Sequence, residues 1–458
     1  MSGPFLEQTT SHTLSIVSLT SSELKQWREQ ASQRENDWLD ATRFEASPGS
    51  HCVMPDDQGS AGRVLAGRAD GDWLWSIAGL SRALGEVSCS LDNAPDAASA
   101  HMAALGFGLG AYTFNHYKKS SGAPAQLVLP SGVDMDRLRA EMEAVNLTRD
   151  LINTPANDMM PEHLAAAAQT LAERHGARFS QVVGDDLLEQ NFPAIHAVGR
   201  ASANAPRLIE LNWGEPNAPK VTIVGKGVCF DSGGLDIKPA AGMRLMKKDM
   251  GGAAHALGVA SLLMAIGCPI SLRVLIPAVE NAISGNAYRP GDVLSTRAGK
   301  TVEVDNTDAE GRIILCDALA LACEDPPQVM VDFATLTGAA RVAVGTDLPA
   351  MFANDDSWAD ALLESSDSTS DPMWRLPLHR PYRELINSRI ADIVNSGGGP
   401  YAGAITAALF LDEFVSKDVP WAHFDLMAWN VRARPGRPEG GEAMSVRAVA
   451  NAIATRFV

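Results

Sequence analysis

The sequence predicts an α/β fold with two domains: a small N-terminal α/β domain, and a larger domain whose mixed, mainly parallel sheet is flanked by helices. Two observations lead to this prediction. A chain of 458 residues is longer than one ordinary hydrophobic core accommodates. Short apolar runs typical of strands also alternate with longer helical segments, which is the pattern of a sheet covered by helices.

The composition narrows the classes of function. With a formal net charge of −17, the chain lacks the basic surface on which nucleic-acid binding depends, so no nucleic acid is expected. The six cysteines form no CxxC pair, which is typical of reduced thiols in the cytoplasm. The opening of the chain has neither the basic nor the apolar region of a secretory signal. We therefore expect a cytoplasmic protein.

The domain boundaries follow from local patterns. From Leu138 to Leu151, apolar residues recur with helical spacing, which predicts a helix between the two domains. The larger domain begins with a helix that Pro161 starts and Gly176 ends. The chain is accordingly divided into an N-terminal α/β domain, a linker helix and the larger domain, at residues 1–132, 133–160 and 161–458.

Strand and helix candidates alternate through the larger domain. The strand candidates are short apolar runs at 208–213, 221–224, 272–277 and 329–333. The helix candidates are longer and lie at 251–267, 311–324 and 404–415. The stretch 250–270 has no charged residue and is long enough to span a bilayer. Its glycines and Pro269 favour a helix buried against a sheet, so no membrane span is expected.

The stretch Asn-Thr-Asp-Ala-Glu-Gly-Arg at 306–312 is the first candidate functional segment. In an extended segment, the alternate residues Asp308, Glu310 and Arg312 would point to one face. Clustered carboxylates beside apolar sequence are costly unless their charge is compensated, and a divalent cation is the usual compensation. A solvated surface turn explains this segment about as well, because Asn, Asp and Gly are ordinary turn residues.

A second charged segment, upstream, favours the metal site. Lys226 and Asp231 follow the apolar run 221–224 in a turn whose glycines let the backbone approach a bound ion closely. Lys238 and Asp249 come next along the chain. Because these residues follow strand candidates, we expect them at the carboxyl edge of the sheet. The full set is Lys226, Asp231, Lys238, Asp249, Asp308, Glu310 and Arg312.

The identity and spacing of these positions resemble the leucyl aminopeptidases of the M17 cytosol aminopeptidase family. The resemblance extends over roughly residues 146–430. It implies a hydrolase, a metal-dependent aminopeptidase that releases leucine-like residues from peptides with a free N-terminus. It also implies two divalent metal ions (Mn²⁺ or Zn²⁺, with Co²⁺ or Mg²⁺ as alternatives), a bicarbonate ion and a homohexamer.

The same resemblance implies a role for each position. The metal ligands are Lys226, Asp231, Asp249, Asp308 and Glu310, of which Asp231 and Glu310 bridge both ions. A lysine ligand must be neutral, and two adjacent dications can lower its pKa from about 10. Lys238 stays charged and stabilises the oxyanion of the tetrahedral intermediate. Arg312 cannot accept a proton itself, and in the family this arginine holds the bicarbonate that serves as general base beside the metal-activated hydroxide.

The pocket for the first residue of the peptide is also implied by the resemblance. Met246, Thr335 and Gly338 match its walls, and the adaptable, apolar Met246 predicts leucine-like and methionine-like first residues. Lys248 departs from the family, which commonly has an aromatic residue there, and the segment 425–430 departs from its usual small residues. Lys247 and Lys248 match no functional position, so we expect both to be solvated charges.

Two other classes of function remain as alternatives. Asp-Ser-Gly-Gly at 231–234 imitates a motif of chymotrypsin-like proteases, which would make Ser232 the nucleophile of a serine-type hydrolase. That fold is all-β, whereas this chain is rich in helical segments. A non-catalytic assembly or DNA-binding role, known as a second function in the family, is the other alternative. The complete charged set argues against a scaffold, and the acidity argues against DNA.

Overall fold

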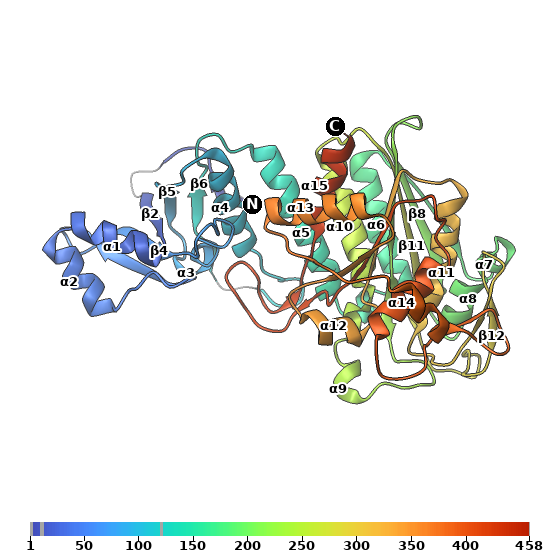
Figure 1. The fold of residues 1–458 in the computed structure, drawn as a ribbon. Helices are drawn as coiled ribbons and strands as arrows, with labels where there is room; N and C mark the ends of the chain where they lie inside the picture. The colour runs from blue at the N-terminus through green and yellow to red at the C-terminus, as the bar shows by residue number, and fades with distance from the viewer. Residues whose placement is uncertain (1–2, 10–12, 120–121, 458) are drawn as a thin grey trace. The chain divides into compact units, whose positions relative to one another are not determined.

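The computed structural model describes residues 3–9, 13–119 and 122–457 (Figure 1). The chain separates into two compact units. The first comprises Met1–Met142 with Arg432–Glu439, and the second comprises Glu143–Val431 with Gly440–Val458. Each unit contains an α/β sheet with helices, as the sequence predicts.

The first unit is built on a six-stranded sheet in the order β1-β6-β5-β2-β4-β3. Its strands are β1 (Phe5–Leu6), β2 (Thr13–Leu19), β3 (His51–Pro55), β4 (Ala61–Gly67), β5 (Ser88–Leu91) and β6 (Gln126–Val128). Its helices are α1 (Ser21–Gln30), α2 (Gln33–Thr42), α3 (Leu80–Ala83) and α4 (Ala97–Gly110). Helices α1 and α2 each begin with a capping box, in which Thr20 or Ser32 exchanges hydrogen bonds with the glutamate three residues later.

The second unit is built on a nine-stranded mixed sheet in the order β16-β15-β18-β14-β9-β11-β8-β7, with β10 also paired to β11. Its strands are β7 (Arg178–Val183), β8 (Arg207–Trp213), β9 (Lys220–Gly225), β10 (Gly227–Asp231), β11 (Ser271–Asn281), β14 (Val329–Ala334), β15 (Ala350–Ala353), β16 (Trp374–Arg375) and β18 (Trp421–Asp425). Neighbouring strands from β18 to β11 run parallel, whereas β15, β8 and β7 pair antiparallel. The predicted mixed, mainly parallel sheet is confirmed.

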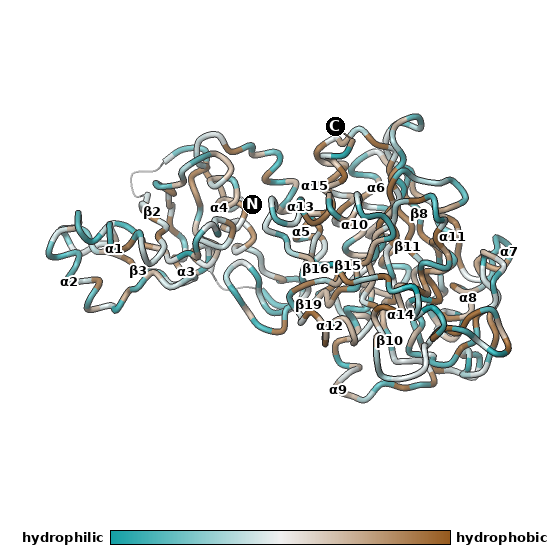
Figure 2. The backbone as a smooth tube through the Cα atoms, viewed as in Figure 1, coloured by the Kyte–Doolittle hydropathy of each residue, from teal (hydrophilic) through white to brown (hydrophobic). Residues whose placement is uncertain are grey.

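Helices cover both faces of this sheet. From residue 135 onward the helices are α5 (Met135–Asn153), α6 (Pro161–His175), α7 (Asp186–Glu189), α8 (Pro193–Gly199), α9 (Ala240–Met243), α10 (Gly251–Ala265), α11 (Glu310–Glu324), α12 (Gly338–Val344), α13 (Asp356–Thr369), α14 (Gly403–Asp412) and α15 (Val446–Phe457). Helices α10 and α15 lie on one face, and α8, α11 and α14 lie on the other (Figure 1). Hydrophobic residues follow these helices and the strands between them (Figure 2). Because both faces are covered, the six residues of β14 are all buried.

The remaining elements of the second unit are short. Two small sheets contain β12 (Val293–Ser295), β13 (Thr301–Glu303) and β17 (Ile393–Val394), and β19 (Trp429–Asn430) and β20 (Gly440–Gly441). Three 3₁₀ helices are η1 (Ala156–Asp158), η2 (Met246–Met250) and η3 (Arg380–Ile386). Among the described residues, no helix has the length and hydropathy that crossing a bilayer requires. The apolar stretch 250–270 forms α10, which packs on β9 and β14.

The segment 306–312 is not extended, so the expected alternation of its charged side chains is wrong. Asn306 Oδ1 accepts a hydrogen bond from Asp308 N (2.7 Å), which closes a turn, and Glu310 begins α11. Asn395 holds the turn in place, because its side chain accepts from Asp305 N (2.8 Å) and donates to Asn306 O (2.7 Å). Glu310 and Arg312 therefore project from the first turn of a helix.

A buried ion pair joins two distant segments of the second unit. Arg149, on α5, donates through Nε to Glu442 Oε1 (2.8 Å) and through Nη2 to Glu442 Oε2 (3.2 Å). Their side chains are only 1% and 6% exposed, respectively. Asn430 also donates to Glu442, so this carboxylate connects β19, the chain after β20 and α5.

We predict that Glu442→Ala destabilises the second unit strongly. The substitution leaves the buried Arg149 guanidinium without its carboxylate partner, which costs about 3–5 kcal/mol in comparable pairs. Calorimetric melting of the full chain measures the change. Glu143→Ala is the control, because its ion pair with Arg174 is about half exposed, and it should cost at most about 1 kcal/mol. Equal effects of the two substitutions would contradict the prediction.

Candidate active site

The carboxyl edge of the large sheet carries a cavity of about 240 Å³. Lys226 directly follows β9, Asp231 is the last residue of β10, and Asp249 lies on η2. Asp308 lies in the turn before α11, and Glu310 is the first residue of that helix. Six of the seven charged residues singled out in the sequence line this cavity: Lys226, Asp231, Lys238, Asp249, Asp308 and Glu310. The seventh, Arg312, is buried on the first turn of α11.

The backbone around Lys226 is fixed by the packing of α10 on the sheet. Lys226 N donates to Phe333 O (2.9 Å) on β14, and Ala253 N on α10 donates to Lys226 O (2.8 Å). This close approach requires Gly252, because a Cβ there would lie 2.1 Å from Phe333 O. The position of the Lys226 side chain therefore follows from the helix–sheet contact.

Two ammonium groups lie among four carboxylates. Lys226 Nζ is 2.7 Å from Asp249 Oδ2 and 2.9 Å from Glu310 Oε1. Lys238 Nζ is 2.8 Å from Asp231 Oδ2 and also contacts Asp308 Oδ1. The two lysines thus partly neutralise the acidic cluster, as charges buried from water require.

The acidic cluster nevertheless remains strained electrostatically. Burial and the charge of Asp231 raise the pKa of Glu310 well above its usual value, and burial with the charge of Asp249 raises the pKa of Asp231. For Lys226, burial lowers the pKa, but the carboxylates of Asp249 and Glu310 outweigh burial and raise it above its usual range. Glu310 and Asp231 therefore hold protons more tightly than usual, and further positive charge beside them would stabilise their ionised forms.

The donor set fits divalent cations. Asp231, Asp308 and Glu310 each offer a carboxylate oxygen, and the three oxygens lie within 4.8 Å of one another. Glu310 Oε2 is buried and has no hydrogen-bond partner among the described residues. Carboxylate oxygens are ligands that Mg²⁺, Mn²⁺ and Zn²⁺ all accept. The cluster can hold metal, whereas an ordinary salt-bridge network would leave no such buried oxygen unpaired.

Neighbouring polar groups orient these carboxylates. Asn281 Nδ2, at the end of β11, donates to Asp231 Oδ1 (2.8 Å), as does Gly233 N (2.8 Å). Thr335 Oγ1 donates to Asp249 Oδ1 (2.8 Å). Sequence reasoning placed Thr335 only in the pocket wall and missed Asn281. A polar residue at the carboxyl end of a buried strand was the signal that could have indicated it.

Not every hydrogen-bond donor of Arg312 has a partner among the described residues. Its Nη1 donates to Asn395 O (2.6 Å), and its buried Nε has no hydrogen-bond partner among the described residues. Burial lowers the pKa of its guanidinium to about 10, so the group stays charged at neutral pH. A buried, cationic donor of this kind suits a small planar anion.

The predicted pocket residues Met246, Thr335 and Gly338 all line the cavity. Lys248 lines it too and is only 5% exposed, so its expected solvation is wrong. The short helix η2 turns its last three residues inward, and burial lowers the pKa of Lys248 to about 8. Arg341, one turn after Gly338 on α12, is a further lining residue that sequence reasoning missed. Arg341 follows Gly338 by three residues, which places both on one side of a helix, and this spacing was the signal that the sequence offered.

Lys247 is also not a freely solvated charge, although it does not line this cavity. Its Nζ donates to Asn153 O (2.6 Å) and lies 5.4 Å from the centre of the Trp429 ring. Burial lowers the pKa of this half-buried lysine. The two neighbouring lysines therefore occupy different surroundings within one turn.

Ser232 does not have the surroundings of a nucleophile. Its Oγ donates to Asn281 O (2.7 Å) and accepts from Gly234 N (3.2 Å), which are the contacts of a turn. Within the part of the chain that the structure describes, no histidine is hydrogen-bonded to it. The α/β sheet also differs from the all-β fold that the chymotrypsin analogy requires.

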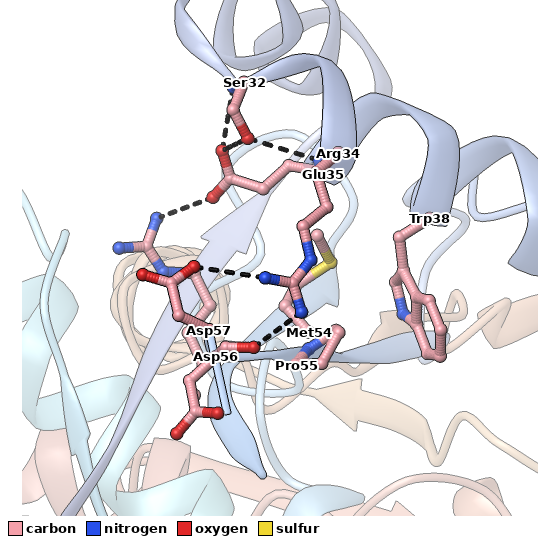
Figure 3. A pocket seen from close by; sticks show the side chains of 10 residues that line it. Ser32, Arg34, Glu35, Trp38, Met54, Pro55, Asp56 and Asp57 are labelled. Carbon is pink, nitrogen blue, oxygen red and sulfur yellow. Dashed lines mark hydrogen bonds and ion pairs between the residues drawn. The ribbon is translucent and has the colours of Figure 1, made fainter. Parts of the chain in front are cut away.

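A larger groove, of about 410 Å³, lies in the first unit between α2 and the turn after β3 (Figure 3). Its charged groups pair with one another, as Arg34 does with Asp57 (3.1 Å) and Arg63 with Glu35 (3.9 Å). Ser32 also binds Glu35 in the capping box of α2. This groove therefore has the character of a paired polar surface, without the buried, uncompensated groups of the cavity in the second unit.

Comparison with known proteins identifies the class. Residues 146–450 match the model of the catalytic domain of the cytosol aminopeptidase family, and residues 14–130 match that of the M17 aminopeptidase N-terminal domain. The protein is thus an aminopeptidase, a hydrolase that acts on peptides. More particularly, the chain belongs to the M17 cytosol aminopeptidase family.

Individual relatives agree with this membership. A protein of Roseiflexus castenholzii named as a cytosol aminopeptidase is 42% identical over 363 residues, which cover 75% of this chain and 74% of the relative. The crystal structure of the cytosol aminopeptidase from Coxiella burnetii is 49% identical, with a TM-score of 0.95 and 99% of both chains covered. The bottromycin maturation enzyme BotP, solved in complex with Mn, is 33% identical with a TM-score of 0.88, covering 98% of this chain and 100% of BotP.

We predict that Gly311→Ala disturbs the acidic cluster without unfolding the chain. A Cβ at Gly311 would lie 2.5 Å from Lys226 Cε, so the buried lysine side chain must move. We expect Mn²⁺ to bind roughly 10- to 100-fold more weakly, as when a supporting residue of a metal site is changed. Isothermal titration calorimetry measures the affinity.

Gly242→Ala is the control for this prediction, because nothing lies within 4 Å of a Cβ at that position. Alanine is otherwise the better helix former, so a loss of helix propensity cannot explain a weaker affinity at position 311. Unchanged Mn²⁺ affinity in Gly311→Ala, with circular dichroism like the parent, would show that Lys226 is not part of the metal site.

Proposed function

We propose that the protein is a metal-dependent aminopeptidase whose metal ligands are Lys226, Asp231, Asp249, Asp308 and Glu310. The observation that supports this most directly is the buried, unpaired Glu310 Oε2 within a cluster of four carboxylates. Two divalent ions, Mn²⁺ or Zn²⁺, would supply Lewis-acid activation of water and of the scissile carbonyl. Asp231 and Glu310, whose pKa values are raised by burial and by neighbouring carboxylates, would be ligands of both ions.

The lysines have separate roles in this proposal. Lys226 donates to Thr335 O (3.0 Å) and is buried within the cluster. It would serve as a neutral ligand there once dications, in place of its ammonium, compensate the neighbouring carboxylates. Lys238 is only partly buried and lies between Asp231 and Asp308 at the cavity wall. Its ammonium would stabilise the oxyanion that develops on the substrate carbonyl.

Arg312 would hold a bicarbonate ion, which would supply the general-base and general-acid chemistry of the site. The four carboxylates would be ligands of the cations, and a guanidinium does not lose its proton at neutral pH. The free Nε of Arg312 supports the assignment, because a guanidinium edge binds a planar anion through two parallel hydrogen bonds.

We assign this chemistry to residues 161–458, with 133–160 as a linker and 1–132 as a separate N-terminal domain. The pocket walls for the first residue of the peptide are Met246, Thr335 and Gly338. We also propose a cytoplasmic homohexamer that acts on peptides with a free N-terminus. These proposals follow from family membership, and light scattering of the purified chain tests the hexamer.

We predict that removing metal abolishes aminopeptidase activity. Exhaustive dialysis against a chelator should stop the hydrolysis of aminoacyl arylamides, and added Mn²⁺, Zn²⁺ or Co²⁺ should restore it. An N-acetylated substrate serves as the control and should stay intact in the metal-loaded enzyme, since its α-amine is blocked. Full activity after verified metal removal would contradict the two-metal proposal. Inhibition by a serine-trapping reagent would instead favour Ser232.

We predict that Arg312→Ala lowers kcat by roughly 10²- to 10⁴-fold, the usual contribution of general-base catalysis. Mn²⁺ affinity should change little, because Arg312 is not a ligand. Wild-type activity should rise with added bicarbonate after thorough degassing, while the variant should show no such rise. A near-normal kcat in the variant, or no response of the wild type to bicarbonate, would require a different base.

A further inference from the structure

The wall of the active-site cavity carries two cations that the proposed chemistry does not use. Lys248 and Arg341 both line the cavity, Lys248 from η2 and Arg341 from α12. Among the described residues, neither side chain forms an ion pair with a carboxylate. Arg341 donates from Nη1 only to the sulfur of Met427 (3.6 Å), which is a weak acceptor. Lys248 is 95% buried and has no side-chain hydrogen bond within the described part of the chain.

The carboxylates closest to Lys248 are already engaged elsewhere. Asp249 contacts Lys226 (2.7 Å) and accepts from Thr335 Oγ1 (2.8 Å). Asp425 accepts from Thr337 Oγ1 (2.6 Å) and from the backbone N–H groups of Leu336 and Thr337 (3.1 Å each). Asp425 thereby fixes the segment that leads into α12. Neither carboxylate forms an ion pair with Lys248 or Arg341 among the described residues, although both attract Lys248 at longer range.

The position of these cations indicates which part of a substrate they would meet. They share the cavity lining with Met246, Gly338 and Leu426, the side of the cavity to which the first side chain of the peptide is assigned. The four carboxylates and the two other lysines form the acidic cluster of the same cavity. The cavity is therefore lined both by an acidic cluster and by two cations that form no ion pair among the described residues.

Lys248 is a buried charge without an ion-pair partner, which is expensive, and such groups are characteristic of binding sites. Arg341 is exposed to solvent and adds a second unpaired cation to the cavity lining. A leucine or methionine side chain in this pocket would leave both cations unpaired and would remove water from them. A carboxylate would satisfy both, because the arginine fork offers it two parallel hydrogen bonds and the lysine adds a point charge. The leucine-like preference expected from Met246 takes no account of this charge.

We propose that Lys248 and Arg341 make this enzyme selective for an acidic first residue, glutamate or aspartate, in the peptide. The proposal rests on the aminopeptidase function proposed above and identifies the substrate class of that site. Lys248 and Arg341 are specificity-determining residues in this assignment. They bind the substrate side chain and take no part in the hydrolytic steps.

The test compares kcat/KM of the Mn²⁺-loaded enzyme for the glutamyl, glutaminyl and leucyl arylamides. These substrates carry no C-terminal carboxylate, so a charge preference can arise only from the first side chain. Glutamate and glutamine have nearly the same shape, and we expect a preference for glutamate of roughly 10- to 100-fold, the contribution of charged hydrogen bonds. Equal or better hydrolysis of the glutaminyl or leucyl substrate overturns the proposal.

Variants locate the source of the preference. Lys248→Met and Arg341→Leu should each reduce the glutamate-to-glutamine ratio at least several-fold and together abolish it, while the leucyl substrate is still cleaved. Replacing the buried Lys248 with an apolar residue of similar length should not impair folding. Lys247→Met is the matched control, since it removes the neighbouring charge, which does not line the cavity, and should leave the ratio unchanged. If both cavity variants retain the glutamate-to-glutamine ratio of the wild type, the proposal is contradicted.

A binding measurement separates this proposal from the proposed function. Calorimetric titration with free L-glutamate and L-glutamine needs no turnover, and L-glutamate should bind the wild type at least roughly 10-fold more tightly, for the same physical reason. An enzyme that hydrolyses none of the three arylamides contradicts the aminopeptidase mechanism, yet the titration still decides the charge preference. Equal binding of the two amino acids overturns the pocket assignment even if hydrolysis proceeds.

Discussion

The need to compensate four clustered carboxylates, three of them buried, governs the active-site region of the second unit. Asp231 ends β10 at the carboxyl edge of the sheet, and η2 and the turn into α11 bring Asp249, Asp308 and Glu310 to the same cavity. Burial first, and then the repulsion from Asp231, raise the pKa of Glu310. Lys226 and Lys238 relieve part of this repulsion, and the unpaired oxygen of Glu310 shows that they do not relieve all of it. In the proposed mechanism, divalent cations would complete the compensation and would make this cluster the reactive centre.

The apolar framework makes this charge cluster possible by holding it without freedom to relax. Helix α10 reaches β14 so closely that only glycine fits at 252, and a Cβ at 311 would strike Lys226. Asn281 and Thr335 direct one oxygen each of Asp231 and Asp249. Packing of this kind fixes the carboxylates before any ligand arrives, so that little reorganisation is needed when one binds.

Two further cations line the same cavity. Lys248 and Arg341 form no ion pair among the described residues, and the carboxylates near Lys248 are hydrogen-bonded or paired to Lys226, Thr335 and Thr337. In our proposal, the acidic cluster serves the chemistry, while Lys248, one position before Asp249, would set the preference for a side chain. Lys248 and Lys247 differ in this respect although they are adjacent in η2. Lys248 lines the cavity, whereas Lys247 lies over the ring of Trp429.

The sequence by itself determined the α/β class, the mixed sheet, its main strands and helices, and the family, because these depend on local periodicity and on charged residues at set distances. The bridging of the acids by Lys226 and Lys238, the support from Asn281 and the burial of Lys248 were decided only by the tertiary structure. The alternation expected for 306–312 was wrong because Asn306 and Asn395, 89 residues apart, close a turn that starts a helix. Burial, hydrogen-bond partners and pKa shifts arise from residues brought together by folding, and a linear pattern does not contain those distances.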